Sequence, residues 1–130
     1  MTNSDPKFQL PGSDTVKKWF GVWPDFHDGE ITNLTLQRQG ESVLRVYPYY
    51  PEKPATVEFI LNELTNLELA GFSHQNVVSA LTIEQVTDEP GDSVLRLQLH
   101  PCFGLAGFID AKQVRVNLIP GKSTDGISLW

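Results

Sequence analysis

The sequence has 130 residues, of which 40% are hydrophobic and 20% charged. A chain of this length can bury one hydrophobic core without help from metal ions or disulfide bonds, so we expect a single domain. Its 10 basic and 16 acidic side chains give a formal net charge of −6. This charge disfavours nucleic acid and anionic lipid as partners and favours a basic partner.

The sequence also bears on cellular location. Its single cysteine, Cys102, cannot form an internal disulfide, and the first residues lack the basic start and apolar run of a signal peptide. No apolar stretch approaches the roughly 20 residues of a membrane-spanning helix. We therefore expect a cytoplasmic protein with no membrane partner, and the oligomeric state stays open.

Two segments precede the first expected strand. Residues 1–12 are polar and proline-containing, which predicts a flexible N-terminal segment ahead of one domain at 13–130. In "SDTVKKWFGVWP", Ser13 or Asp14 can cap a helix of about two turns, and Gly21 and Pro24 can end it. The nearby rings of Trp19, Phe20, Trp23 and Phe26 are expected in the core rather than in a ligand cage, because a sheet with one polar face needs buried apolar area.

From Glu30 onward, apolar and polar residues alternate with the period of two that is typical of β-strands. The clearest example is "SVLRLQLHP", where Leu95, Leu97 and Leu99 are expected to face inward. Further strands are predicted in the segments 30–37, 42–50, 56–61, 81–86 and 113–121, with a shorter extended piece at 65–72, a possible helical turn opening 73–86 and a hairpin turn at "DEPGD". The sequence therefore predicts an all-β (mainly β) antiparallel fold of about six to seven strands with one short N-terminal helix. It forms either a small sandwich or one strongly curled sheet.

The segment "WPDFHDGEI" is the strongest candidate for chemistry. In an extended chain Asp28 and Glu30 share a side, whereas His27 points away unless Gly29 bends the backbone. The other histidines, His74 and His100, do not have the spacing of metal ligands. We interpret His27 as held by hydrogen bonds where the chain enters a strand, with carboxylates capping turn amides, and we predict no metal, cofactor or catalytic residue.

Two further motifs give weak chemical signals. Cys102 follows His100 by two residues, which is too far along a strand for a hydrogen-bonded nucleophile pair, so an inert, buried thiol is expected. "IPGKSTDG" ends like a phosphate-binding loop but lacks that motif's first glycine and the helix that should follow. What remains is surface: an outward polar sheet face that includes Arg45, Tyr47 and Tyr49, and an acidic group of Asp25, Asp28 and Glu30.

Three stretches together resemble a known family. They are "FHDGEI" at the first strand, "NLELAGFSHQNVV" in the middle and "LHPCFGLAGFIDAKQVRV" near the end. In order and spacing, from about Trp23 to Pro120, the chain is similar to the bacterial immunity proteins of polymorphic-toxin systems, specifically the immunity protein fifty family. The resemblance carries over no established functional residues.

The resemblance implies a non-catalytic protein that binds the catalytic domain of a cognate toxin and protects the producer and its kin. Because the outward polar face and the acidic group are the surface features described above, the resemblance suggests five candidate toxin-binding residues: Asp25, Asp28, Glu30, Tyr47 and Tyr49. The matched residues of "GFSHQN" are expected to hold the fold: Gly71 allows a sharp turn, Phe72 anchors it, and the side-chain amides of Gln75 and Asn76 satisfy backbone groups of the loop. The alternative is a small β-class enzyme, or a metal- or small-ligand-binding protein, that uses His27, Asp28 and Glu30.

Overall fold

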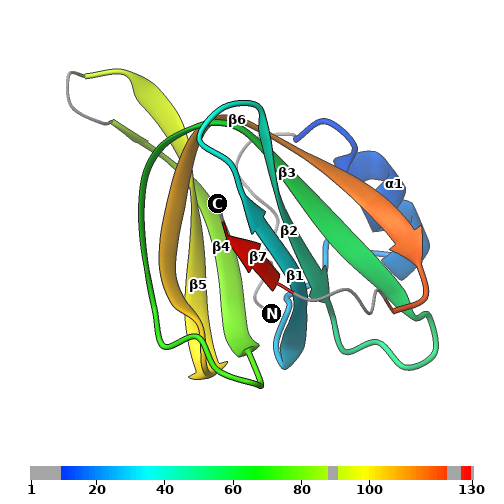
Figure 1. Ribbon diagram of the computed structural model, residues 1–130. Helices are drawn as coiled ribbons and strands as arrows, with labels where there is room; N and C mark the ends of the chain where they lie inside the picture. Colours follow the sequence, from blue (N-terminus) through cyan, green and yellow to red (C-terminus); the bar gives the residue numbers. More distant parts are fainter. Residues whose placement is uncertain (1–9, 88–90, 123–126, 130) are drawn as a thin grey trace.

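The computed structural model describes residues 10–87, 91–122 and 127–129, which form one helix and seven strands (Figure 1). The elements are α1 (Ser13–Phe20), β1 (Gly29–Leu36), β2 (Glu41–Tyr47), β3 (Ala55–Ala70), β4 (Val77–Thr87), β5 (Ser93–Phe103), β6 (Ala106–Pro120) and β7 (Ile127–Leu129). The predicted all-β class with one short N-terminal helix is confirmed.

The helix covers the predicted residues but begins differently. Its N-cap is Gly12, with φ 89°, and no side chain caps it, so neither Ser13 nor Asp14 has the predicted role. A side chain at Gly12 would collide with the backbone carbonyl of Val116 on β6, against which the helix packs. At the other end Gly21 takes the left-handed conformation and donates its N–H to the last helical turn, as predicted.

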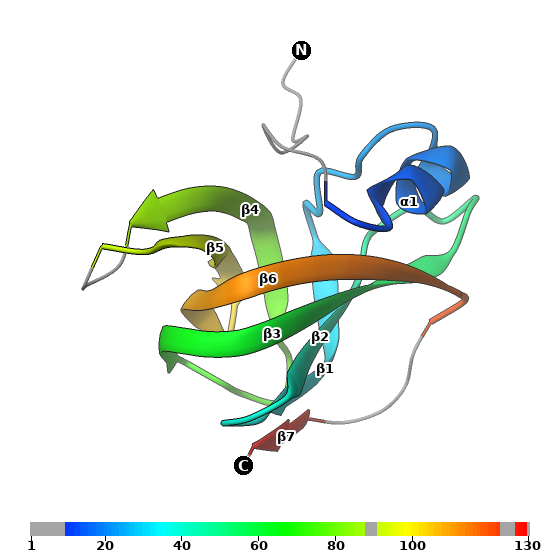
Figure 2. The same ribbon diagram turned by 90° about the horizontal axis from the view of Figure 1, so that it is seen from above.

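The strands form one sheet in the order β2-β3-β6-β5-β4-β1-β7, and β1 also pairs with β2. Because β1 is hydrogen-bonded to β2 and to β4, the sheet curls until it closes on itself. Figure 2 shows the bent strands crossing one another, with α1 on one side. The strongly curled sheet is therefore confirmed over the sandwich.

The closure between β1 and β4 is short. Only Gly29 and Glu30 of β1 pair with β4. Further along, Leu34 to Leu36 of β1 pair in parallel with β7, which occupies the edge that β4 leaves.

The chain before the helix covers another free edge. β5 pairs with β6 only as far as Ala111, and beyond it the Val116 N–H donates to the Pro11 carbonyl at 2.9 Å. Leu10 is 2% exposed. The last residues of the segment predicted to be flexible therefore pack on the sheet, and residues 1–9 lie outside the described part of the chain.

The core fills the inside of the curled sheet. The inward residues follow the predicted alternation, and the fully buried ones include Leu44, Val46, Val57, Phe59, Leu61, Leu97 and Ile109. Opposite them, the outward face carries cross-strand polar pairs such as Arg45 with Glu58, whose Nε and Oε2 atoms are 2.9 Å apart. Alternation along each strand thus separates core from surface.

Some predicted elements differ from the observed ones. β3 is one strand of 16 residues instead of two pieces, with a register shift between Leu64 and Asn66 that accommodates one extra residue. β6 begins at Ala106 rather than near Gln113 because the long β3 supplies a partner for its first half. Residues 73–76 form a loop, not a helical turn. The predicted β4–β5 hairpin is present, but its turn residues 88–90 lie outside the described residues.

Candidate functional site

The turn before β1 is tight and has an unusual backbone. Phe26 and Asp28 have φ values of 61° and 63°, a left-handed conformation that is uncommon for residues other than glycine. The Gly29 N–H donates to the Phe26 carbonyl at 2.8 Å, and Asp25 Oδ1 accepts the His27 N–H at 3.0 Å. The predicted capping of a turn amide by a carboxylate is thus confirmed.

The inside of this turn is aromatic. Phe26 is 0% exposed, and its ring centroid lies 5.8 Å from those of Trp23 and Phe59. Burial of the ring offsets the backbone strain at the same residue. Phe20 is also buried and Trp19 is half-buried against the core, so the prediction that these rings are core residues is confirmed.

The outside of the turn carries two polar side chains. His27 and Asp28 are 63% and 56% exposed, with Nδ1 and Oδ1 3.4 Å apart. His27 is therefore held at the entry to the strand by the hydrogen bond of its backbone N–H to Asp25, while its ring is mostly exposed. Glu30 instead forms an ion pair with Lys122, at 2.6 Å. No group of three His, Cys, Asp or Glu side chains within the described residues could hold a metal ion.

Four of the five candidate binding residues lie around the start of β1. Asp25 and Asp28 are exposed in the turn, and Glu30 pairs across the sheet with Tyr47. Lys122 Nζ lies 5.5 Å from the centroid of the Tyr47 ring. Tyr49 is 67% exposed and borders a separate surface hollow of about 490 Å³ beside α1.

The loop 71–76 crosses from β3 to β4 and is fixed by one buried amide. Asn76, 5% exposed, accepts at Oδ1 from the N–H groups of Ser73 and Leu105, at 3.1 and 2.9 Å. Its Nδ2 donates to the Ser73 carbonyl, and its own carbonyl accepts the Ile31 N–H. A Cβ on Gly104 would collide with the Asn76 side chain. The predicted role of this amide in satisfying loop backbone groups is confirmed.

Two large apolar side chains stand out of the same region. Phe72 is 58% exposed and Phe103 is 60% exposed. Phe103 pairs with Val77 at the start of β4, and a Cβ on Gly71 would lie 2.7 Å from the Gly104 carbonyl oxygen. Phe72 does not anchor the loop as predicted, because Asn76 does so, and the sequence gives no sign that either ring is exposed.

The turn and the loop lie at the same end of the sheet. The Asp28 N–H donates to the Val78 carbonyl at 2.9 Å, and Val78 pairs with Pro101 near the end of β5. In Figure 1 this end, with the start of β4 and the end of β5, is at the bottom of the view. Eight of its exposed residues are named here the rim surface: Asp25, His27, Asp28, Phe72, His74, Pro101, Cys102 and Phe103.

The cysteine and the histidine before it do not behave as a pair. Cys102 is exposed, contrary to the predicted buried thiol. His100 Nε2 lies 3.3 Å from Thr82 Oγ1, on the neighbouring strand. The His100 ring therefore contacts a hydroxyl group on β4.

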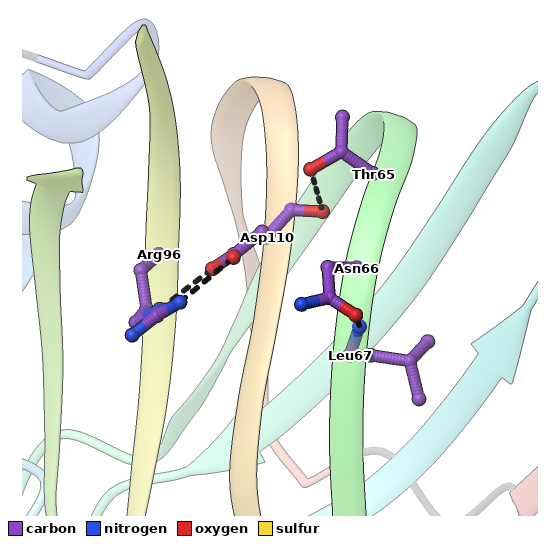
Figure 3. A network of polar contacts seen from close by, with 5 residues as sticks. All are labelled: Thr65, Asn66, Leu67, Arg96 and Asp110. Carbon is purple, nitrogen blue, oxygen red and sulfur yellow. Dashed lines mark hydrogen bonds and ion pairs between the residues drawn. The ribbon is translucent and has the colours of Figure 1, made fainter. Parts of the chain in front are cut away.

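A second polar group lies on the outward face of the middle strands (Figure 3). Asp110 is 2% exposed and accepts two hydrogen bonds from Arg96, at 2.8 and 3.0 Å. These hydrogen bonds raise the pKa of Arg96 above its ordinary value, against the opposing effect of its burial. The guanidinium also lies over the Phe108 ring, 4.0 Å from its centroid, and Thr65 Oγ1 donates to the Asp110 carbonyl. The polar side chains of this group bond to one another, and these bonds connect β3, β6 and β5.

Four surface hollows that are lined by described residues lie away from the rim surface. Besides the one beside Tyr49, hollows of about 460, 520 and 390 Å³ occur at β1 and β3, at α1 and Pro120, and at Leu10 and β6. No residue of the rim surface borders these four hollows.

No helix in the described part of the chain combines the length and the hydropathy of a membrane span. No model of a known protein family matches the chain. Searches of curated proteins and of solved structures found no significant match. The immunity-protein resemblance therefore stays a prediction.

Proposed function

We propose that this chain is a cytoplasmic, non-catalytic immunity protein, which binds and neutralises the catalytic domain of a cognate bacterial toxin and protects the producer and its kin. One observation carries the proposal. The three stretches that resemble immunity proteins are far apart in the sequence, yet "FHDGEI", "GFSHQN" and "HPCFG" meet at the rim surface. The three stretches therefore contribute to a single exposed surface. The alternation of apolar and polar residues along each strand does not predict this proximity.

The same geometry favours binding over catalysis. Glu30 forms its ion pair with Lys122, while the other two members of the cluster, His27 and Asp28, face solvent. An acid–base site or a metal site needs such groups to converge on one reacting atom or ion in a sheltered place. An exposed surface with two large apolar rings has the composition of a protein interface.

The frame beneath the rim surface also supports this role. Asn76 ties the crossing loop, the β5–β6 turn and β1 to one another. A surface held in one conformation before binding has less conformational entropy to lose, which favours tight inhibition.

The experiment uses the C-terminal domain of the large secreted protein encoded beside this chain's gene. Expressed alone in a bacterial host, that domain should arrest growth, and co-expression of this chain should restore it. The two purified proteins should elute together in size-exclusion chromatography. A neighbourhood without such a protein, or a domain that kills equally with and without this chain, would contradict the proposal.

A further inference from the structure

We infer that the rim surface is the toxin-binding site, with Phe72 and Phe103 as its anchors, and that it fits a cationic protein surface containing an apolar recess. This inference rests on the proposed function. It names the contact surface and the chemistry of the partner, which the resemblance leaves open.

The two rings carry the apolar part of the argument. Phe72 and Phe103 are 58% and 60% exposed, so both residues are largely accessible to water in the free protein. Rings of this size dominate binding energy when a partner buries them in a pocket. They stand on adjoining backbone, since the loop that begins at Gly71 packs against Gly104. One partner surface can therefore contact both.

The charges around the rings define the partner further. Asp25 and Asp28 are exposed on the turn bonded to the start of β4. The rim surface contains no lysine or arginine, and the nearby Lys122 is engaged by Glu30. The whole chain carries a formal net charge of −6. Carboxylates beside apolar anchors, within a negative field, attract and orient a basic surface.

A cationic surface is what an enzyme that acts on a polyanion presents around its active site. An acidic inhibitor surface with apolar anchors can cover such a site and exclude the polyanion. We therefore assign the partner to toxin domains that act on nucleic acid.

The first experiment measures the affinity of the full chain for the purified toxin domain by isothermal titration calorimetry. Phe72→Ser and Phe103→Ser should each raise the Kd at least tenfold, as truncation of an interface anchor does. Val22→Ser is the matched control, because Val22 is 55% exposed just after α1 and is not one of the residues of the rim surface. Circular dichroism and thermal unfolding should show all three variants folded like the wild type.

The second experiment tests the charges. Asp25→Asn and Asp28→Asn remove the charge but keep one side-chain oxygen, which at position 25 can still accept the His27 N–H. Asparagine also tolerates the left-handed backbone at position 28. The double variant should lower the association rate several-fold at low salt and flatten its salt dependence. Glu63→Gln, at an exposed carboxylate in the middle of β3, should leave the rate unchanged.

The outcomes separate the two levels of the proposal. A wild-type chain that neither binds nor protects contradicts the proposed function itself. A wild-type chain that binds, with Phe72→Ser and Phe103→Ser variants of unchanged affinity, overturns only the assignment of the rim surface. A binding rate that rises with salt, or a toxin domain that leaves nucleic acid intact, overturns the partner chemistry. Self-association of the wild type that Phe72→Ser abolishes assigns the rim surface to a second copy of the chain and likewise overturns the inference.

Discussion

Two phenylalanines at the same end of the molecule have opposite positions. Phe26, in the turn before β1, is 0% exposed, while Phe72, in the loop before β4, is 58% exposed. Phe26 holds its own turn in place, since its ring packs on Trp23 and Phe59 while its backbone is strained. The loop that contains Phe72 is instead held by the side-chain amide of Asn76, which forms hydrogen bonds with the loop backbone.

The difference shows how a surface is freed for binding. Where an apolar ring stabilises a turn, the ring is buried in the core and cannot contact a partner. Where a buried polar side chain satisfies the loop backbone, the ring next to it is left in solvent.

The largest effect is expected at the buried ring. Phe26→Ala removes a fully buried side chain while keeping the strained backbone, and should reduce the free energy of unfolding by about 3–5 kcal/mol. Phe72→Ala should change it by no more than about 0.5 kcal/mol, because its ring is mostly in water. Urea unfolding followed by tryptophan fluorescence measures both. Equal losses in the two variants would refute the comparison.

The next largest effect is expected at the amide that frees Phe72. Asn76→Ala leaves the buried N–H of Leu105 without its acceptor and should cost about 2–4 kcal/mol of unfolding free energy. Gln75→Ala, at the exposed neighbour, is the control and should cost less than about 0.5 kcal/mol. Similar losses for the two variants would show that Asn76 does not fix the loop.

Arg96→Ala should cost about 2–3 kcal/mol, because it leaves Asp110 buried without its partner. Arg115→Ala breaks the more exposed pair with Glu41 and should cost about 0.5 kcal/mol or less. Losses of equal size in the two variants would contradict this account.

The loss of unfolding free energy caused by Arg96→Ala should not depend on pH near neutrality. The pKa of Arg96 is raised, so its stabilisation is complete below the unfolded pKa and disappears only as pH rises through the folded value. Both values lie far above neutral. The difference between the wild type and Arg96→Ala should therefore persist from pH 7 to about pH 9, and a difference that vanished over this range would argue against the assigned cause.

The smallest effect is expected at the histidine outside the turn. His27→Ala should change the free energy of unfolding by less than about 0.5 kcal/mol, because the ring is mostly exposed. The variant should still protect cells from the toxin domain in the growth assay. A folded variant that no longer protects would assign His27 a direct role and revive the alternative of a ligand-binding or catalytic cluster.

Alternation predicted most of the fold. The inward leucines of β5, the aromatic core and the glycine that ends α1 follow from local pattern and backbone preference, and the structure confirms them. The closure of β1 onto β4 and the continuity of β3 through Thr65 depend on pairing between distant strands, which no local pattern contains.

The site was only partly predictable for the same reason. The acidic residues of the turn were found because charge is visible in the sequence. The exposure of Phe72 and Cys102 was missed, since a phenylalanine or cysteine is usually buried, and only the tertiary positions of the loop 71–76 and of the end of β5 show otherwise. The burial of Asp110 was missed because its partner Arg96 lies on another strand.

The most direct test is amide hydrogen exchange of this chain, free and bound to the toxin domain. We expect binding to slow exchange in the turn at 25–29, in the loop 71–76 and at 101–105, with no change in α1 or at 49–53. Protection confined to α1 and residues 49–53, with unchanged exchange at the rim surface, would contradict the account.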